Sequence, residues 1–282
     1  MNKVGIVVDS TVYLSKEIIK KYDIHIVSLK VSVNDETFDE VDITREFVME
    51  KRKEGAKFQT SAPAPGTFLE TYQELLKTND YVFVIGLSRE LSGTYQSSLL
   101  GKNMLDDPSK VILLDTLSSA YGNELLVHVL LALIHTEEDV FQIEKRMHEY
   151  INHETLMFTC ENLFSLVSGG RLSVTRAMIG TVLRVKPIIE MQEGKLNHIK
   201  SERTYQKVFA LIQKRIEETT SNDPKQLYIY ITQTNSQKSG DMLVEFIKEH
   251  YPKAKVIYTD LLGPVMTVHV GNKGFGIAWT YE

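Results

Sequence analysis

The first half of the chain alternates strand-forming runs with helical patterns, and this alternation restricts the possible fold more than any other feature. The strand-forming runs are KVGIVVD (3–9), DIHIVSLKVSV (23–33), YVFVIGL (81–87) and KVILLD (110–115). Helices are expected at 15–22, 45–53, 67–76, 92–105, 120–134 and 137–152. Strands joined through helices lie parallel in one sheet, so the predicted fold class is α/β, with helices covering a parallel sheet.

The second half of the chain has a different pattern. Seven strand-forming runs follow residue 153, and only two long helical patterns, at 205–218 and 237–250, lie among them. We therefore predict two domains. Residues 1–153 would form an N-terminal α/β/α domain with a parallel sheet, and residues 154–282 a C-terminal α/β domain with a mixed sheet.

Two details of the second half bear on its sheet. The runs VKPIIEMQ and KLNHIKS, within 185–201, flank Glu193 and Gly194, which is typical of a β-hairpin. The run MTVHV at 266–270 predicts a strand that carries His269. A hairpin supplies antiparallel neighbours, so the sheet should be mixed.

Composition and charge exclude several classes of protein. The net charge of −5, with no basic tract, argues against a nucleic-acid partner. Cys160 is the one cysteine, so no internal disulfide can form, and a reducing compartment, the cytoplasm, is expected. The longest apolar run, at 125–134, is ten residues interrupted by His128, which is too short to span a membrane.

The segment SRELSGTYQSS, at 88–98, is the strongest candidate site because it directly follows a predicted strand. A helix beginning near Ser92 would present unpaired backbone N–H groups and the positive end of its dipole, and Gly93 and Thr94 would let an oxyanion approach. The segment thus predicts a site for a carboxylate or phosphate. Alternatively, Ser92 only caps the helix.

Three further motifs carry polar side chains that suit an anion. Prolines stiffen TSAPAPG and would hold the hydroxyls of Thr60 and Ser61 in place, although a helix-initiating turn explains them equally well. Two glycines in SGGRLS would let Arg171 reach an anion or, alternatively, a neighbouring carboxylate. His269 needs a polar partner, since a lone histidine on a strand is usually a packing residue.

Familiar catalytic motifs are missing. Ser88 lies in GLSRE rather than in a GxSxG elbow, there is no GxxxxGK[ST], and GFGIAW lacks the third glycine of a dinucleotide fingerprint. HEYINH at 148–153 has HExxxH rather than HExxH spacing, which would not bring both imidazoles to one helical face. No metal, nucleotide cofactor or covalent catalysis is therefore expected.

The motifs taken together resemble those of the DegV family. They are DST near the N-terminus, TSAP, LSGTYQS, GGRLS, KPII with a following KSERT, and a terminal GPV with a histidine and glycines. The resemblance covers essentially the whole chain and implies a bacterial, non-catalytic protein that binds a long-chain fatty acid such as palmitate, with its carboxylate near the domain boundary. It also implies a partner, an ATP-dependent kinase subunit that phosphorylates the bound acid to an acyl phosphate.

The resemblance also implies roles for residues at matching positions. Thr60, Ser92 and His269 look like the groups that hold the carboxylate, and Arg171 resembles an arginine near the head group. Ser61, Gly93 and Thr94 would be neighbours of that head group. Arg203 of KSERT resembles a residue associated with kinase docking or phosphoryl transfer.

The chain departs from the family in one place. The family commonly shows GTH before a GPG turn, whereas this chain has TVH followed by Gly271, Asn272 and Lys273, which puts the backbone of that turn in doubt. Apolar residues that could line an acyl tunnel look in sequence like ordinary core; they include Phe158, Leu163, Phe164, Leu166, Ile179, Leu183 and Ile188.

Two other functions stay open. Ser92 with His269 could form an acyl hydrolase or acyltransferase, and the same site could bind another small carboxylate or a phosphorylated lipid.

Overall fold

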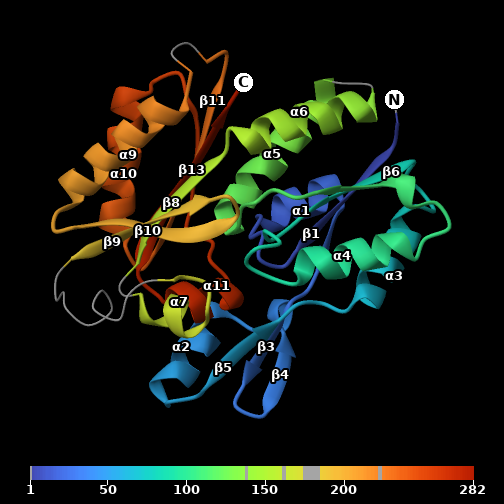
Figure 1. Cartoon of the computed structure of the whole chain (residues 1–282), viewed down its shortest axis with the longest axis horizontal. Helices are drawn as coiled ribbons and strands as arrows, with labels where there is room; N and C mark the ends of the chain where they lie inside the picture. The colour runs from blue at the N-terminus through green and yellow to red at the C-terminus, as the bar shows by residue number, and fades with distance from the viewer. Residues whose placement is uncertain (1, 137–138, 161–162, 174–184, 222–223) are drawn as a thin grey trace.

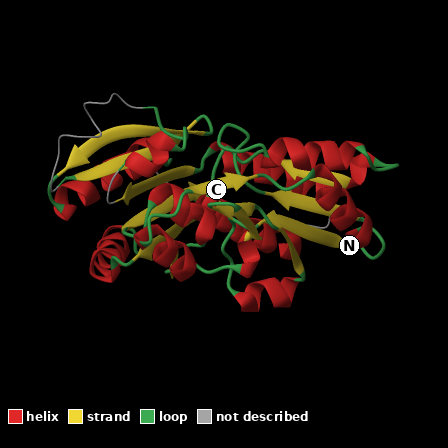
Figure 2. Ribbon diagram, turned by 90° about the horizontal axis from the view of Figure 1, so that it is seen from below, coloured by secondary structure: helices red, strands yellow, loops and turns green. Residues whose placement is uncertain are grey.

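A computed structural model describes residues 2–136, 139–160, 163–173, 185–221 and 224–282 of the chain. These residues form three sheets with helices packed on them. The two larger sheets lie side by side along the long axis of the molecule (Figures 1 and 2). One of them is parallel and the other mixed, as the sequence predicts.

The N-terminal sheet is parallel throughout and has the strand order β2-β1-β6-β7. Its strands are β1 (Val4–Asp9), β2 (Ile24–Val27), β6 (Tyr81–Ile85) and β7 (Val111–Leu114). The accompanying helices are α1 (Lys16–Tyr22), α3 (Pro65–Leu75), α4 (Thr94–Asn103), α5 (Ala120–Thr136), α6 (Val140–Asn152) and the 3-10 turn η2 (Pro108–Lys110). Apolar side chains of α1, α5 and α6 pack on one face, and those of α3 on the other.

A small antiparallel sheet, β4-β3-β5, was not predicted. It contains β3 (Lys30–Val33), β4 (Glu36–Asp39) and β5 (Phe58–Ser61), with the 3-10 turn η1 (Glu40–Asp42) and α2 (Arg45–Lys53) between β4 and β5. The run at 23–33, expected to be one strand, is divided between β2 and β3. The division falls at Leu29, whose N–H donates to the Ser10 hydroxyl and whose carbonyl accepts from the Glu40 N–H, so neither group joins a ladder.

The C-terminal sheet is mixed, with the order β10-β9-β8-β13-β11-β12; among these described strands, β11 and β12 pair in parallel and the other neighbours pair antiparallel. Its strands are β8 (Thr155–Cys160), β9 (Lys186–Gln192), β10 (Lys195–Glu202), β11 (Leu227–Thr234), β12 (Lys255–Thr259) and β13 (Gly274–Tyr281). The predicted β9–β10 hairpin is confirmed, because Glu193 and Gly194 have φ values of 50° and 78°, as a type I′ turn requires.

Helices cover both faces of the mixed sheet. The helices α9 (Tyr205–Thr219) and α10 (Gln237–His250) pack on one face, and α5 contacts β11 and β13 on the other. Because α5 also packs on β6, it joins the two larger sheets (Figure 1). The boundary at residues 153 and 154 lies between α6 and β8, and the division into two domains stays a prediction.

The strand predicted at 266–270 is wrong. These residues belong to the helix α11 (Pro264–Val270), so His269 lies on a helix. Pro264 opens the helix, and Gly271, with φ of 84°, ends it. Seven residues are too few for an isolated helix, so its stability comes from tertiary contacts, which a local pattern of valine and threonine does not reveal.

Three other helices begin two or three residues away from their predicted first residues. α4 begins at Thr94 rather than Ser92, because the Ser92 N–H donates to the Ser88 carbonyl in a preceding turn. α3 begins at Pro65 rather than Thr67, since proline suits the first helical position. α6 begins at Val140 rather than at 137; residues 137 and 138 lie outside the described part.

Candidate functional site

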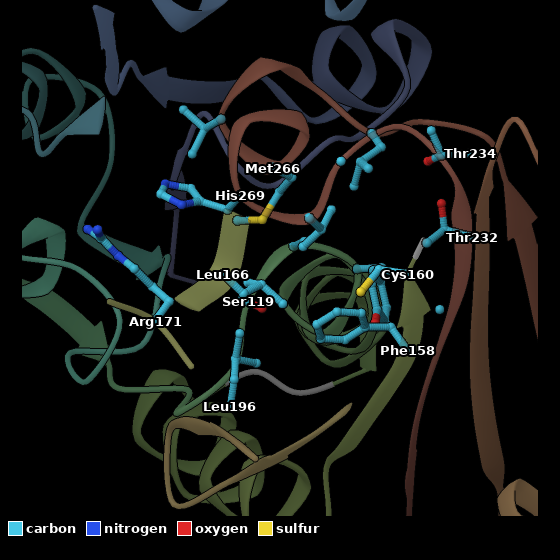
Figure 3. Close-up of a pocket in the computed structure, with 18 of the residues that line it drawn as sticks. Ser119, Phe158, Cys160, Leu166, Arg171, Leu196, Thr232, Thr234, Met266 and His269 are labelled. Atoms are coloured by element: carbon cyan, nitrogen blue, oxygen red, sulfur yellow. The ribbon is translucent and has the colours of Figure 1, made fainter. Parts of the chain in front are cut away.

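A pocket opens between the mixed sheet, α5 and α11. It contains about 900 Å³ of space free of protein atoms, part of it open to solvent. Figure 3 shows Arg171 and His269 on one side, Thr232 and Thr234 on the opposite side, and Phe158, Cys160 and Leu196 between and below them. The polar groups predicted for an anion therefore lie at one end of an otherwise largely apolar pocket.

The floor of the pocket is the face of β8, β13 and β11. In the strand register, Phe158, Gly276 and Thr232 form one row, and Cys160, Gly274 and Thr234 form the next. The two glycines of GFGIAW lie in the central strand of both rows, so the floor between the flanking side chains is bare backbone. A Cβ at Gly276 would lie 2.4 Å from the ring of Tyr121, which fills part of that space.

Thr60 and His269 meet at the polar end of the pocket. The Thr60 hydroxyl and the His269 Nε2 are 2.9 Å apart, although 209 residues separate them in the chain. β5 carries the threonine and α11 the imidazole, and both side chains line the pocket. The structure thus brings these two motifs together and gives the histidine a polar partner at the pocket wall, while their role in holding a carboxylate stays a prediction.

The electrostatic field at this end favours an anion. Burial, together with the nearby Arg171 and Arg52 guanidinium groups, lowers the pKa of His269 to about 4. His269 is therefore neutral at physiological pH. Arg52 donates to the Val268 carbonyl over 2.8 Å, near the C-terminal end of α11, and Lys273 also lines the pocket. A carboxylate in the pocket would meet the Arg171 guanidinium and a neutral imidazole able to donate one hydrogen bond.

Arg171 and Ser92 complete the polar end. The guanidinium of Arg171 donates to the carbonyls of Gly169 (2.6 Å) and Leu91 (3.3 Å), which fixes it beside the Ser92 segment. The Ser92 hydroxyl lies 2.9 Å from the Thr94 hydroxyl and accepts from the Thr94 N–H at 3.3 Å. Ser92 thus lines the pocket and also satisfies the first N–H of α4.

Gly169 has a second role. A Cβ at this position would lie 3.1 Å from Nδ1 of His269, so the glycine lets the chain after α7 (Phe164–Ser168) pass close to the imidazole. The SGGRLS motif therefore supplies both the arginine and the close approach that brings it to the pocket.

Sequence reasoning missed the group that holds α11 in position. The carboxylate of Glu40 accepts from the Val265 N–H and from the Tyr13 hydroxyl, each at 2.8 Å, and from the Ser10 hydroxyl. The Tyr13 hydroxyl also accepts from the Met266 N–H at 3.3 Å. Burial raises the pKa of Glu40 to about 7. Only the DST motif hinted at this cluster, because Ser10 belongs to it.

Several predicted residues lie away from the pocket lining. Ser61 and Gly93 are exposed, Thr94 is buried behind Ser92, and Arg203 is exposed in the turn between β10 and α9. Of the apolar candidates, Phe158 and Leu166 line the pocket, while Leu163, Phe164 and Ile188 do not; Ile179 and Leu183 lie outside the described residues.

Ser92 and His269, the two side chains considered for catalysis, are not paired. Within the described part of the chain, the structure gives no hydrogen bond between Ser92 and His269, whose polar contacts go to Thr94 and Thr60. No group of three His, Cys, Asp or Glu side chains suited to a metal occurs among the described residues. No helix in the same ranges is long and apolar enough to cross a bilayer.

The chain matches one family of known proteins along nearly its whole length. The model of the DegV family, described as "Uncharacterised protein, DegV family", matches residues 3–282. A DegV domain-containing protein of Halalkalibacterium halodurans is 29% identical over 285 aligned positions and covers 100% of both chains. A solved structure described as fatty acid binding of a DegV family protein from Thermus thermophilus has a TM-score of 0.88 to this chain at 24% identity. The alignment covers 99% of this chain and 100% of that one.

A second solved structure is more similar in sequence. DegV of Bacillus subtilis, described as a fatty acid binding protein, is 26% identical with a TM-score of 0.84, and the two chains cover each other completely.

Proposed function

Because the chain belongs to the DegV family, we propose that it binds one long-chain fatty acid in this pocket. The observation that carries the proposal is the Thr60–His269 pair at the polar end of a largely apolar space. The description of the Bacillus subtilis protein supports the same ligand class. Burying about fourteen methylenes contributes on the order of 11 kcal/mol, at about 0.8 kcal/mol each, so the apolar chain would provide most of the affinity.

The carboxylate would bind at Thr60, Ser92 and His269. Both hydroxyls can donate to it, and the neutral imidazole can donate through Nε2 once the Thr60 hydroxyl turns toward the ligand. Arg171 would supply the compensating charge that a partly buried carboxylate needs. Ligand binding would then exchange the Thr60–His269 hydrogen bond for two bonds to one anion.

The protein would deliver its ligand to a partner rather than transform it. The chain carries no phosphate-binding loop, and Ser92 lacks a base within hydrogen-bonding reach among the described side chains. A separate ATP-dependent kinase would phosphorylate the bound carboxylate to an acyl phosphate. Arg203, exposed in its turn, is available for that contact. With one cysteine the chain can form no internal disulfide, which fits the reducing cytoplasm, where we expect this exchange.

Native mass spectrometry of the freshly purified protein tests the binding. We expect a mass increment of one long-chain acid, and one-to-one uptake of palmitate by delipidated protein. Thr60→Val should weaken palmitate binding by about tenfold, whereas Thr37→Val, in the same small sheet but outside the pocket lining, should not. No copurified acid together with no palmitate uptake would refute the proposal.

The delivery step needs its own experiment. Palmitate-loaded protein is mixed with a bacterial fatty acid kinase subunit and ATP, and acyl phosphate is followed by phosphorus NMR. Arg203→Ala should abolish phosphorylation while leaving palmitate binding intact. Lys207 is an exposed basic residue in the first turn of α9. The matched control, Lys207→Ala, should change neither phosphorylation nor palmitate binding. Equal phosphorylation with Arg203→Ala would exclude that residue from the kinase contact.

A further inference from the structure

The wall opposite the arginine carries hydroxyl groups where an acyl chain needs none. Thr232 and Thr234 face the pocket from β11, on the side away from Arg171 (Figure 3). They alternate along the strand with Ile231 and Gln233, so they share the face of Tyr230 and of the glycine floor. The pocket is therefore apolar in its middle but has polar groups at both sides.

Thr232 is the informative member of this wall. Its side chain is 3% exposed, and its Oγ1 has no hydrogen-bond partner in the part of the chain that the structure describes. Its register partners are Gly276 on β13, which has no side chain, and Thr259 on β12, to which the structure gives it no hydrogen bond; Phe158, beyond Gly276, has no polar atom in its side chain. A saturated chain laid over this row would leave the hydroxyl unsatisfied, which is an unfavourable arrangement for a buried polar group.

We propose that the pocket selects long-chain acids that carry a hydroxyl group part-way along the chain, and that Thr232 recognises this hydroxyl. The Thr232 hydroxyl would donate to the ligand oxygen. This inference rests on the proposed fatty-acid binding and extends it to a substrate class, the hydroxylated long-chain acids. The position of the ligand hydroxyl is fixed by the two ends of the pocket, because the carboxylate is held at the polar end and Thr232 lies across from it.

Thr259 provides a matched control. It is paired with Thr232 in register on β12, so its side chain lies on the same face of the sheet. Thr259 does not line the pocket. A change of threonine to valine removes a hydroxyl from the same face of the sheet at both positions, but only the change at Thr232 alters the surface that a ligand touches.

The test is a competition between stearic acid and a positional series of monohydroxystearic acids on delipidated protein, read by native mass spectrometry. We expect one position, or two adjacent ones, to be preferred over stearic acid by about two- to tenfold, the range of one neutral hydrogen bond. Thr232→Val should remove this preference and bind stearic acid at least as tightly, while Thr259→Val keeps the preference. Thermal unfolding of both variants checks that they are folded.

The outcomes separate the two proposals. Binding of stearic acid without preference for any hydroxylated isomer overturns the inference and leaves fatty-acid binding standing. A preference that survives in Thr232→Val also overturns it, because the hydroxyl would then be recognised elsewhere. If neither stearic nor hydroxystearic acids bind, the proposed function and the inference fall together.

Discussion

Replacing Glu40 with glutamine should make the protein's stability less dependent on pH. Glu40 is buried at the start of α11, with Tyr13 and Ser10 donating to it and Asp9 nearby. Its pKa rises from 4.5 to about 7 in the folded protein. The unfolded chain loses the proton near pH 4.5 and the folded one near pH 7, so stability from this group is full below pH 4.5 and falls as pH rises to about 7.

The size of the effect follows from the shift. A change of about 2.5 pKa units corresponds to about 3 kcal/mol in the free energy of unfolding, at 1.36 kcal/mol per unit. Burial also raises the pKa values of Glu124 and Glu154, to about 8 each, but those groups titrate alike in both proteins and cancel in the comparison. The wild type should therefore lose about 3 kcal/mol more than Glu40→Gln between pH 4.5 and pH 7.5.

Urea unfolding at four pH values across that range measures the difference, with the fluorescence of Trp279, which is fully buried, as the probe. Glu46→Gln is the control, because Glu46 lies in the first turn of α2 and its carboxylate is exposed. The free energy of unfolding of Glu46→Gln should depend on pH as that of the wild type does. Parallel curves for the wild type and Glu40→Gln would refute the idea that burial of this carboxyl controls its titration.

Three other changes test the pocket and the sheet. Gly276→Ala should shift binding toward shorter acids, since the added Cβ meets Tyr121 at 2.4 Å; equal affinities across a series of acids from ten to eighteen carbons would contradict this. Arg215→Ala should destabilise the fold by about 2 kcal/mol in urea unfolding, because it leaves the buried Glu190 carboxylate without its paired guanidinium; an unchanged midpoint would count against the pair. His269→Gln should keep palmitate affinity within about threefold of wild type, since the glutamine amide can replace the Nε2–H donor, whereas His269→Ala should lose about tenfold; equal losses would exclude a donor role.

The parts of the fold that depend on local sequence were predictable. The β9–β10 hairpin follows from Glu193 and Gly194 alone, and α10 begins and ends at the predicted residues. The helix α11 was not predictable, because the carboxylate that accepts from its first turn comes from Glu40, 225 residues earlier in the chain. Valine and threonine favour strands locally, and this long-range contact overrides the preference.

The candidate site likewise has a part that could be predicted from the sequence and a part that could not. Thr60, Ser92, Arg171 and His269 could be chosen from motifs, and the structure brings all four to one pocket. The unsatisfied hydroxyl of Thr232 could not be found in sequence, because a threonine in a strand is ordinary and only the three-dimensional surroundings show that it lacks a partner among the residues that the structure describes.

The glycine floor also determines how the pocket behaves when it is empty. A wall made of side chains can rotate into a vacant space and must be displaced before a ligand enters. The floor at Gly274 and Gly276 is main chain in a strand that is hydrogen-bonded on both sides, to β8 and to β11, so it can rise only by breaking those ladders. Apart from the space beside Gly276 that the Tyr121 ring fills, the empty protein should therefore keep this side of its pocket at full depth, and ligand binding does not have to reopen it.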